Sequence, residues 1–289
     1  MANLALGTVQ FGLPYGIANQ IGQVNHMEAN RIIELARSNK IDTLDTAIAY
    51  GQSEVCLGQI GVSDFKVVTK LPALPEDVTD VGLWVREQMQ ASLRRLNMTG
   101  VHGLLLHRSQ QLINSKRKVL VQALEQLKED GIVQKIGVSI YDHSELTNII
   151  NYFPIDLVQS PYNLIDQSLQ TSGWLKKLVD SNVEIHTRST FLQGLLLMPT
   201  AAIPKKFKLW FPLFNKWHSW LLDNNISAIQ ACLGFIKSYS QISKIVIGVD
   251  SAQQFKQLID LDKLPESLIW PDIQCSDSRL INPSNWNLL

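Results

Sequence analysis

The stretch of sequence that decides the fold runs from Gly131 to Gln159 and reads GIVQKIGVSIYDHSELTNIINYFPIDLVQ. An apolar run at 132–139 is followed by an amphipathic segment at 144–152, and a second apolar run occupies 156–159. Gly131 stands directly after another helical pattern, where glycine commonly ends a helix. Short apolar runs that alternate with amphipathic segments are typical of buried parallel strands joined by helices, so this stretch predicts a strand–helix–strand unit.

The same alternation extends in both directions along the chain. Apolar residues recur at helical spacing in most of the intervals between the apolar runs, for example at Leu120, Ala123, Leu124 and Leu127. A short helix is expected from Glu54 to Gly61, and later helices at 144–152, 168–180, 227–240 and 252–261. Strands are expected at residues 4–8, 41–45, 66–70, 103–107, 132–139, 156–159, 183–187 and 244–248.

Repeated strand–helix units predict an α/β protein built on a parallel sheet. A doubly wound open sheet and a closed barrel both satisfy the pattern, but no G-x-G-x-x-G follows the first strand, which weakens the dinucleotide-fold alternative. The sequence therefore predicts a single-domain (β/α)8 barrel over residues 1–263, with a C-terminal tail at 264–289 packed on it. The segment 188–225, which is rich in Trp and Phe, is too long for a plain connection and is expected to pack partly over a barrel face.

Composition excludes several classes of protein. The 289 residues contain 26 Lys+Arg and 26 Asp+Glu, and this balance argues against nucleic-acid binding or attachment to anionic lipid by charge alone. The three cysteines are scattered and match no zinc spacing, which favours a reducing compartment. The start, MANLALGTVQ, lacks the basic region of a signal peptide, and no long apolar stretch suits a membrane span. We expect a cytoplasmic protein without membrane or nucleic-acid partners.

Titratable residues gather at the predicted ends of consecutive strands, where barrels of this kind carry their active sites. Asp45, Lys70 and His107 end three strands, and Tyr50 follows Asp45 closely. A lysine ammonium lowers the pKa of a nearby tyrosine, a carboxylate satisfies a buried lysine, and a neutral histidine can donate a hydrogen bond to a carbonyl oxygen. This set suits protonation of a carbonyl oxygen while hydride from a cofactor reaches the carbon.

Each of these four residues also has a purely structural interpretation. Asp45 could cap a helix, Tyr50 could be an amphipathic rim residue, Lys70 could be solvated, and His107 could be a hydrogen-bonded structural histidine. Their occurrence on consecutive strand ends favours the chemical interpretation, because random surface placement does not usually gather these types at one mouth.

The sequence resembles the aldo-keto reductase family over nearly its full length. The matching segments are LALGTVQFG, IDTLDTAIAYGQSEVCLGQI, KVVTKLP, SLRRLNMTGVHGLLLHR, GIVQKIGVSIYD, LVQSPYNL, RSTFLQGLLL and IVIGVDSAQQF. The resemblance implies a (β/α)8 barrel that binds a nicotinamide dinucleotide without a Rossmann motif and transfers hydride between it and a small carbonyl or alcohol substrate.

Residue roles follow from the resemblance alone. It implies Tyr50 as the general acid, Lys70 as the residue that tunes it, Asp45 as the partner of Lys70, and His107 as the residue that orients the carbonyl. The implied cofactor-binding positions are Gly7, Thr8, Asp45, Ser139, Gln159, Arg188, Ser189, Gly248, Asp250, Ser251 and Gln254. Of these, Ser139 and Gln159 match residues that hold the carboxamide of the nicotinamide.

Three positions depart from the family pattern. Ile140 stands where many members have an Asn that holds the carboxamide of the nicotinamide. Arg188 stands where many have a stacking aromatic; its planar guanidinium can also stack, or can contact phosphate or substrate, and Phe191 is a second stacking candidate. Asp250 stands in a loop where members that prefer NADP usually carry Lys or Arg. NADP is the family expectation, whereas an acid at this place favours the free ribose hydroxyl of NAD, and Ser251 at a helix start could still bind phosphate.

The sequence gives less information about the substrate pocket. Phe11, Tyr15 and Trp210 are candidates for its walls, and simple packing is their alternative role. The compact form and the FLQGLLL segment are similar to reductases of sugar and surface-polysaccharide metabolism, so an aldehyde, a ketone or an aldose is expected, in either reaction direction.

Two other functional classes remain open at this stage. A non-catalytic or regulatory cofactor-binding protein could keep the same fold, although the intact Asp45, Tyr50, Lys70 and His107 set argues against it. A barrel lyase or metal hydrolase would need several His or carboxylate ligands on strand ends. The six histidines are not clustered in that way, so no metal is expected.

Overall fold

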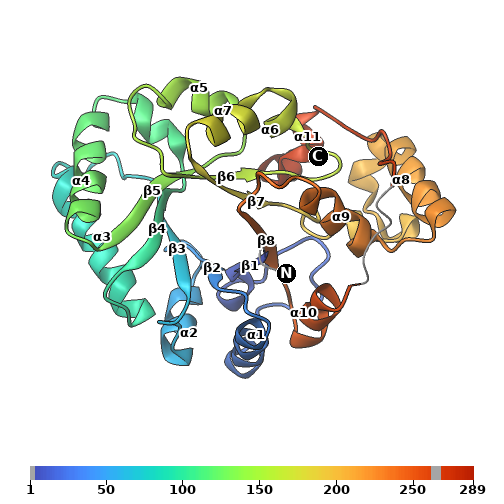
Figure 1. Ribbon diagram of the computed structural model, residues 1–289, viewed down its shortest axis with the longest axis horizontal. Helices are drawn as coiled ribbons and strands as arrows, with labels where there is room; N and C mark the ends of the chain where they lie inside the picture. The colour runs from blue at the N-terminus through green and yellow to red at the C-terminus, as the bar shows by residue number, and fades with distance from the viewer. Residues whose placement is uncertain (1–3, 262–267) are drawn as a thin grey trace.

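The computed structural model describes residues 4–261 and 268–289. Within these residues, parallel strands close into a barrel in which neighbours in space are neighbours in sequence, and β8 pairs with β1 (Figure 1). The strands are β1 Leu4–Gly7, β2 Thr43–Asp45, β3 Lys66–Leu71, β4 Val101–Leu106, β5 Val133–Ser139, β6 Leu157–Pro161, β7 Glu184–Arg188 and β8 Lys244–Gly248. The predicted (β/α)8 barrel is confirmed, and the open-sheet alternative is wrong.

The helices follow the predicted alternation with one interruption. The expected helix at 168–180 is split in two, because Gly173 adopts a φ of 80° that an α-helix cannot accommodate. The helices are α1 His26–Ser38, α2 Ser53–Ile60, α3 Val81–Leu96, α4 Arg117–Glu129, α5 Ser144–Ile149, α6 Ser168–Thr171, α7 Trp174–Asp180, α8 Phe211–Asn224, α9 Ala228–Lys237, α10 Ala252–Ile259 and α11 Ser278–Ile281, with 3₁₀ turns at η1 Val9–Phe11, η2 Ser109–Ile113, η3 Leu195–Leu197, η4 Thr200–Ala202, η5 Lys205–Trp210 and η6 Pro283–Leu288.

The Trp- and Phe-rich segment after β7 divides into two parts. Its first residues line the mouth of the barrel, whereas α8 lies at the side of the molecule, near α9 and the C-terminal residues (Figure 1). Trp217 is fully buried and donates to the carbonyl of Leu196 at 3.0 Å. Trp220 stacks on Trp217 with ring centroids 5.8 Å apart and donates to the carbonyl of Ile269 at 3.1 Å. Most of this aromatic surface therefore stabilises the side of the barrel rather than covering a face.

The described part of the C-terminal tail contacts the body of the protein. Trp286 is buried against Phe207, with ring centroids 5.0 Å apart, and its carbonyl accepts from Lys206 at 2.9 Å. The predicted division between residues 263 and 264 lies outside the described residues, so the boundary of the tail remains a proposal. No helix within 4–261 and 268–289 is long and apolar enough to cross a membrane.

Candidate active site

Strand alternation points two of the predicted catalytic residues into the barrel. Val68 of β3 and Leu105 of β4 belong to the small apolar cluster in the barrel interior. Side chains two residues apart on a strand share a face, so Lys70 points inward above Val68, and His107, directly after β4, follows the direction of Leu105. Both residues therefore lie at the C-terminal mouth.

A buried ion pair occupies the floor of this mouth. The Lys70 side chain is fully buried, and its Nζ donates to Oδ1 and Oδ2 of Asp45 at 2.7 and 2.6 Å and to the carbonyl of Thr46 at 2.9 Å. Asp45 Oδ2 also accepts from Nε2 of Gln159 at 2.7 Å, and the Asp45 side chain is 6% exposed. The charges are thus paired and hydrogen-bonded, which is the condition under which a buried pair is tolerated.

Tyr50 and His107 lie above this pair, and both are half-buried. Their rings meet edge to face, with centroids 5.8 Å apart and an interplanar angle of 78°. Lys70 Nζ lies 5.1 Å from the centroid of the Tyr50 ring. The fold thus brings together all four side chains that the strand-end rule selected.

The electrostatics of the mouth keep Tyr50 protonated and His107 neutral. Burial and the nearby Asp45 carboxylate raise the pKa of Tyr50 well above its ordinary value, and the Arg188 guanidinium opposes this rise. Burial and the charge of Lys70 lower the pKa of His107 to about 4. Burial also lowers the pKa of Lys70, whereas Asp45 raises it.

The expected lowering of the Tyr50 pKa by Lys70 is not found. Asp45 engages the Lys70 ammonium through both carboxylate oxygens, so much of its positive charge is offset before it reaches the phenol. The cation whose charge opposes the rise in the pKa of Tyr50 is Arg188.

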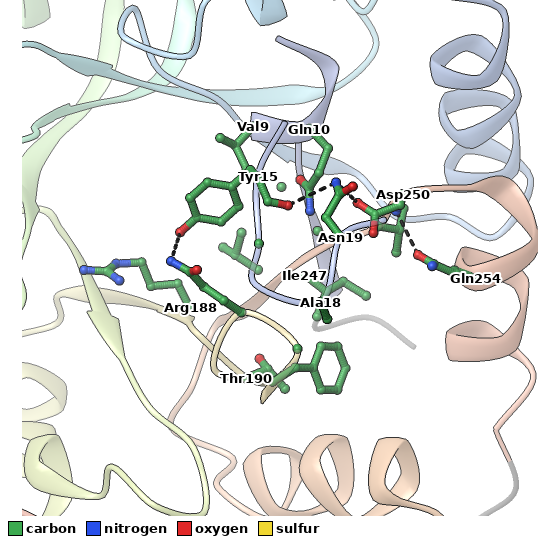
Figure 2. A pocket seen from close by; sticks show the side chains of 18 of the residues that line it. Val9, Gln10, Tyr15, Ala18, Asn19, Arg188, Thr190, Ile247, Asp250 and Gln254 are labelled. Atoms are coloured by element: carbon green, nitrogen blue, oxygen red, sulfur yellow. Dashed lines mark hydrogen bonds between the residues drawn. The ribbon is translucent and has the colours of Figure 1, made fainter. Parts of the chain in front are cut away.

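A cavity of about 360 Å³ begins at Asp45 and Tyr50 and extends to the loop after β8. In Figure 2, Tyr15 and Arg188 lie at one end, and Asp250 and Gln254 lie at the other. The predicted residues that line it are Gly7, Thr8, Tyr15, Asp45, Tyr50, Arg188, Ser189, Phe191, Gly248, Asp250 and Gln254.

Two buried polar atoms of the lining have no partner within the described chain, Oε1 of Gln10 and Oγ1 of Thr190. Gln10 is 8% exposed and Thr190 is 2% exposed. The Gln10 amide rests on Gly248, because a Cβ at Gly248 would lie 2.5 Å from Gln10 Nε2. Unsatisfied buried polar atoms are costly, so both atoms favour a polar ligand in the cavity. The Gln10 oxygen can accept from a ligand hydroxyl, and the Thr190 hydroxyl can donate to a phosphate, and a nicotinamide dinucleotide offers both groups.

The far end of the cavity is organised around Asp250. Asn19 donates through Nδ2 to Oδ1 of Asp250 at 3.0 Å, joining the loop after β1 to the loop after β8 (Figure 2). The Gln254 side chain accepts from the backbone N–H of Asp250 at 2.8 Å. The Ser251 hydroxyl caps α10 by accepting from the Gln254 N–H at 3.1 Å, so it is already engaged within the protein. In the described chain, no Lys, Arg or His nitrogen forms an ion pair with Asp250.

The two residues expected at the carboxamide of the nicotinamide lie next to Asp45. Ser139 Oγ donates to Oε1 of Gln159 at 3.1 Å, and Gln159 in turn donates to Asp45. Neither residue is among those that line the cavity. Thr8 contacts the same region from β1, since its hydroxyl donates to the carbonyl of Asp45 at 2.9 Å.

Of the three aromatic candidates for the pocket wall, only Tyr15 lines the cavity. Its hydroxyl accepts from Gln193 Nε2 at 3.1 Å across the mouth. Phe11 is 1% exposed and belongs to the hydrophobic core. Trp210 is 7% exposed and packs on Phe207, with ring centroids 6.3 Å apart. The pocket-wall interpretation of Phe11 and Trp210 is therefore corrected to their alternative role in packing.

Sequence reasoning missed several residues of the lining, among them Gln10, Asn19, Thr190 and Gln193. Gln10 and Thr190 each follow the end of a strand by a few residues. Extending the strand-end rule into the loops would have selected these two. Within the described residues, no group of three or more His, Cys, Asp or Glu side chains is arranged to hold a metal ion.

Comparisons with known proteins agree with this fold. The family model for the Aldo/keto reductase family matches residues 3–267. A relative named NADH-specific methylglyoxal reductase, from Escherichia coli K12, is 23% identical and covers 75% of this chain and 77% of its own length. The holo form of an aldo-keto reductase from Bacillus halodurans superposes with a TM-score of 0.71 at 19% identity, covering 91% of this chain and 88% of that one. A glycerol dehydrogenase from Gluconobacter oxydans has a TM-score of 0.68 at 19% identity, covering 90% and 86%.

A closed barrel with a cavity at its C-terminal mouth is the arrangement in which (β/α)8 enzymes carry their active sites. The chain belongs to the aldo-keto reductase family, whose members act on small carbonyl compounds with a nicotinamide cofactor.

Proposed function

We propose that this protein reduces a small aldehyde, ketone or aldose with hydride from NADH, using Tyr50 as the proton donor. The observation that carries the proposal is the buried Asp45–Lys70 pair beneath Tyr50 and His107, at the start of a cavity with unsatisfied polar atoms. The names of two similar proteins, a methylglyoxal reductase and a glycerol dehydrogenase, support a small polar substrate. An aldose of surface-polysaccharide metabolism remains one candidate within this class.

The cavity lining would hold the cofactor along its length. Gln10 and Thr190 offer unsatisfied polar atoms in its middle, and Asp250 with Gln254 would meet the adenosine portion. Ser139 and Gln159, expected at the carboxamide, already form a chain of hydrogen bonds to Asp45. A bound nicotinamide would supply the hydride.

Side chains of the protein carry out the proton transfer to the substrate. The Tyr50 hydroxyl donates its proton to the carbonyl oxygen of the substrate as negative charge develops there. The neutral His107 imidazole donates a hydrogen bond to the same oxygen and orients it. The phenolate left on Tyr50 is stabilised by the positive charge of Arg188, which favours the ionised form of the phenol. Asp45 keeps Lys70 charged and in place in spite of its complete burial.

The decisive test combines nucleotide binding with turnover. Purified protein titrated with NADH is expected to shift the nucleotide fluorescence, and to oxidise NADH when a small aldehyde such as methylglyoxal is added. A protein that binds neither NADH nor NADPH would rule out the proposal. Tight binding without turnover across a broad panel of aldehydes, ketones and aldoses would instead favour a regulatory role.

The shifted pKa values of Tyr50 and His107 predict how the reaction rate depends on pH. His107 becomes cationic only as the pH falls toward about 4, and Tyr50 keeps its proton through neutral and moderately alkaline pH. We therefore expect kcat/KM for reduction to stay level from about pH 8 to about pH 5 and to fall below that. The measurement is a pH–rate profile with saturating NADH. An inflection near pH 6.5 that disappears in His107→Gln would contradict this assignment.

The choice between NADH and NADPH rests on Asp250. Its carboxylate is half-buried, oriented by Asn19 and without a cationic partner in the described chain. A ribose 2′-phosphate placed beside it would meet like charge, whereas a free 2′-hydroxyl could donate to it. The NADH-specific name of a similar protein supports the same choice. We therefore favour NADH over the family expectation of NADP.

Removing the charge of Asp250 should reduce the preference for NADH over NADPH. The wild-type protein is expected to bind NADH at least about tenfold more tightly than NADPH, a difference of about 1.4 kcal/mol. Asp250→Asn should bring the two Kd values to within about threefold of each other, chiefly by improving NADPH binding, as fluorescence titration would show. Asp260→Asn removes a carboxylate that pairs with Lys256 at the other end of α10, and it serves as the matched control. An unchanged ratio in Asp250→Asn would place the adenosine elsewhere.

A further inference from the structure

Arg188 is the one Lys or Arg among the residues that line the described cavity. It ends β7, and Figure 2 shows it at the opposite end of the cavity from Asp250. Its charge acts on the catalytic groups, because it opposes the rise in the pKa of Tyr50 and contributes to the lowered pKa values of Lys70 and His107. The positive charge of Arg188 is therefore concentrated where the carbonyl substrate would react.

Neutral groups hold this guanidinium in place. Nη2 donates to the carbonyl of Ile140 at 2.9 Å, and Nη1 donates to the hydroxyl of Ser189 at 3.2 Å. The Arg188 Cζ lies 4.4 Å from the centroid of the Tyr141 ring, which is a cation–π contact. The departure from the family pattern at 140 does not weaken this arrangement, because Ile140 uses its backbone carbonyl.

In the described part of the chain, the Arg188 guanidinium forms no ion pair. Among residues 4–261 and 268–289, no carboxylate lies within 4 Å of Arg188, whereas Lys70 is paired with Asp45. The buried Asp166 carboxylate is the acid that feels the Arg188 charge, which lowers its pKa against the effect of burial, but the two side chains do not form an ion pair. A partly buried guanidinium that is fixed by neutral partners keeps its charge and its other N–H groups for a ligand. Arginine matches carboxylate and phosphate oxygens in a bidentate manner.

We propose that Arg188 binds an oxyanion at the substrate end of the cavity, so that the preferred substrates are carbonyl compounds that also carry a carboxylate or a phosphate. This inference rests on the proposed function and adds the substrate class to it. The same chemistry could be supplied by the pyrophosphate of the cofactor. We commit to the substrate because Figure 2 shows Arg188 beside Tyr15 at the end of the cavity opposite Asp250, whereas the unpartnered Thr190 hydroxyl can donate to a cofactor phosphate.

The experiment compares aldehydes that share a carbon skeleton and differ in whether they carry an anionic group. The pairs are 4-carboxybenzaldehyde with methyl 4-formylbenzoate, and glyceraldehyde 3-phosphate with glyceraldehyde. We expect the wild-type enzyme to show at least about tenfold higher kcat/KM for the charged member of at least one pair. Arg188→Gln should reduce that ratio to about one, mainly through KM, and Arg188→Lys should keep part of it.

Arg117 offers a matched control. Its Cζ lies 4.1 Å from the centroid of the Tyr152 ring, so it makes the same kind of contact, but it lies outside the cavity at the start of α4. Arg117→Gln should keep the charged-to-neutral ratio of the wild type. The Kd for NADH, followed by fluorescence, is measured in every variant and also reports that the variant is folded.

Two results would overturn the inference while leaving the proposed function intact. One is a wild-type enzyme that reduces both members of each pair equally well. The other is an Arg188→Gln variant that loses NADH affinity and loses activity on charged and neutral substrates to the same extent, which would assign Arg188 to the cofactor phosphates. Failure of the wild-type protein to bind any nicotinamide nucleotide would instead reject the proposed function.

Discussion

Tyr50→Phe is expected to lower kcat for aldehyde reduction by about 10²- to 10⁴-fold while NADH still binds. The substitution removes only the hydroxyl that would protonate the carbonyl oxygen, and it keeps the ring that packs on His107. His107 cannot replace it as the acid, because its pKa of about 4 leaves it without an ionisable proton of suitable strength at neutral pH. Steady-state kinetics and nucleotide fluorescence on the same preparation measure both effects.

Tyr239→Phe is the matched control for this variant. The Tyr239 hydroxyl donates to Gln170 at 2.9 Å, and the residue does not line the cavity. Its loss should therefore cost the fold one hydrogen bond, about 1 kcal/mol, without changing kcat more than about twofold. If Tyr50→Phe kept more than about a tenth of the wild-type kcat, another group would be the proton donor.

Lys70→Met is expected to reduce the free energy of unfolding by about 3–5 kcal/mol and to abolish measurable turnover. Methionine fills much of the same volume, so the loss comes chiefly from leaving the Asp45 carboxylate buried without its counter-charge. The remaining donor, Gln159 at 2.7 Å, is neutral and compensates only in part. Denaturation by urea at neutral pH, with the midpoint and the slope compared, measures the change.

The double variant Asp45→Asn with Lys70→Met separates the contribution of the buried charge to the loss of stability from the contribution of packing. It removes both charges and keeps both volumes, so most of the lost stability should return, because paired removal of a buried ion pair is often nearly neutral. Turnover should remain absent, because neither the lysine nor its partner is restored. A double variant as unstable as Lys70→Met alone would attribute the loss to packing.

The strands could be predicted because their signal is local. Each observed strand begins and ends within two residues of its predicted range, since a strand buried on both faces leaves an apolar run that stands out from the amphipathic helices. The helix at 168–180 was wrong in one respect, since Gly173 breaks it. A single glycine inside a helical pattern is tolerated or disruptive according to its backbone conformation, which the pattern does not contain.

The four residues proposed for catalysis could be predicted because strand ends converge at one mouth of a closed barrel. The orientation of the residues around the mouth could not be predicted from the sequence. Every residue of β1 is buried, so no alternation of polar and apolar residues told whether Phe11, in the turn that follows, would enter the cavity or the core. The lack of hydrogen-bond partners at Gln10 and Thr190 could not be predicted either, because it depends on which atoms surround these side chains in the folded protein.

The sequence by itself determined the eight strand–helix units, the membership in a family, and the presence of Asp45, Tyr50, Lys70 and His107 at one end of the barrel. Those features depend on the spacing of residue types along the chain, which can be read directly from the sequence. Only the tertiary structure decided how the charges are paired: Asp45 forms an ion pair with Lys70, Arg188 forms none within the described residues, and Asp250 faces the cavity with Asn19 instead of a cation. Such balances depend on distances between residues far apart in sequence, because electrostatic interaction falls with separation in space and not along the chain.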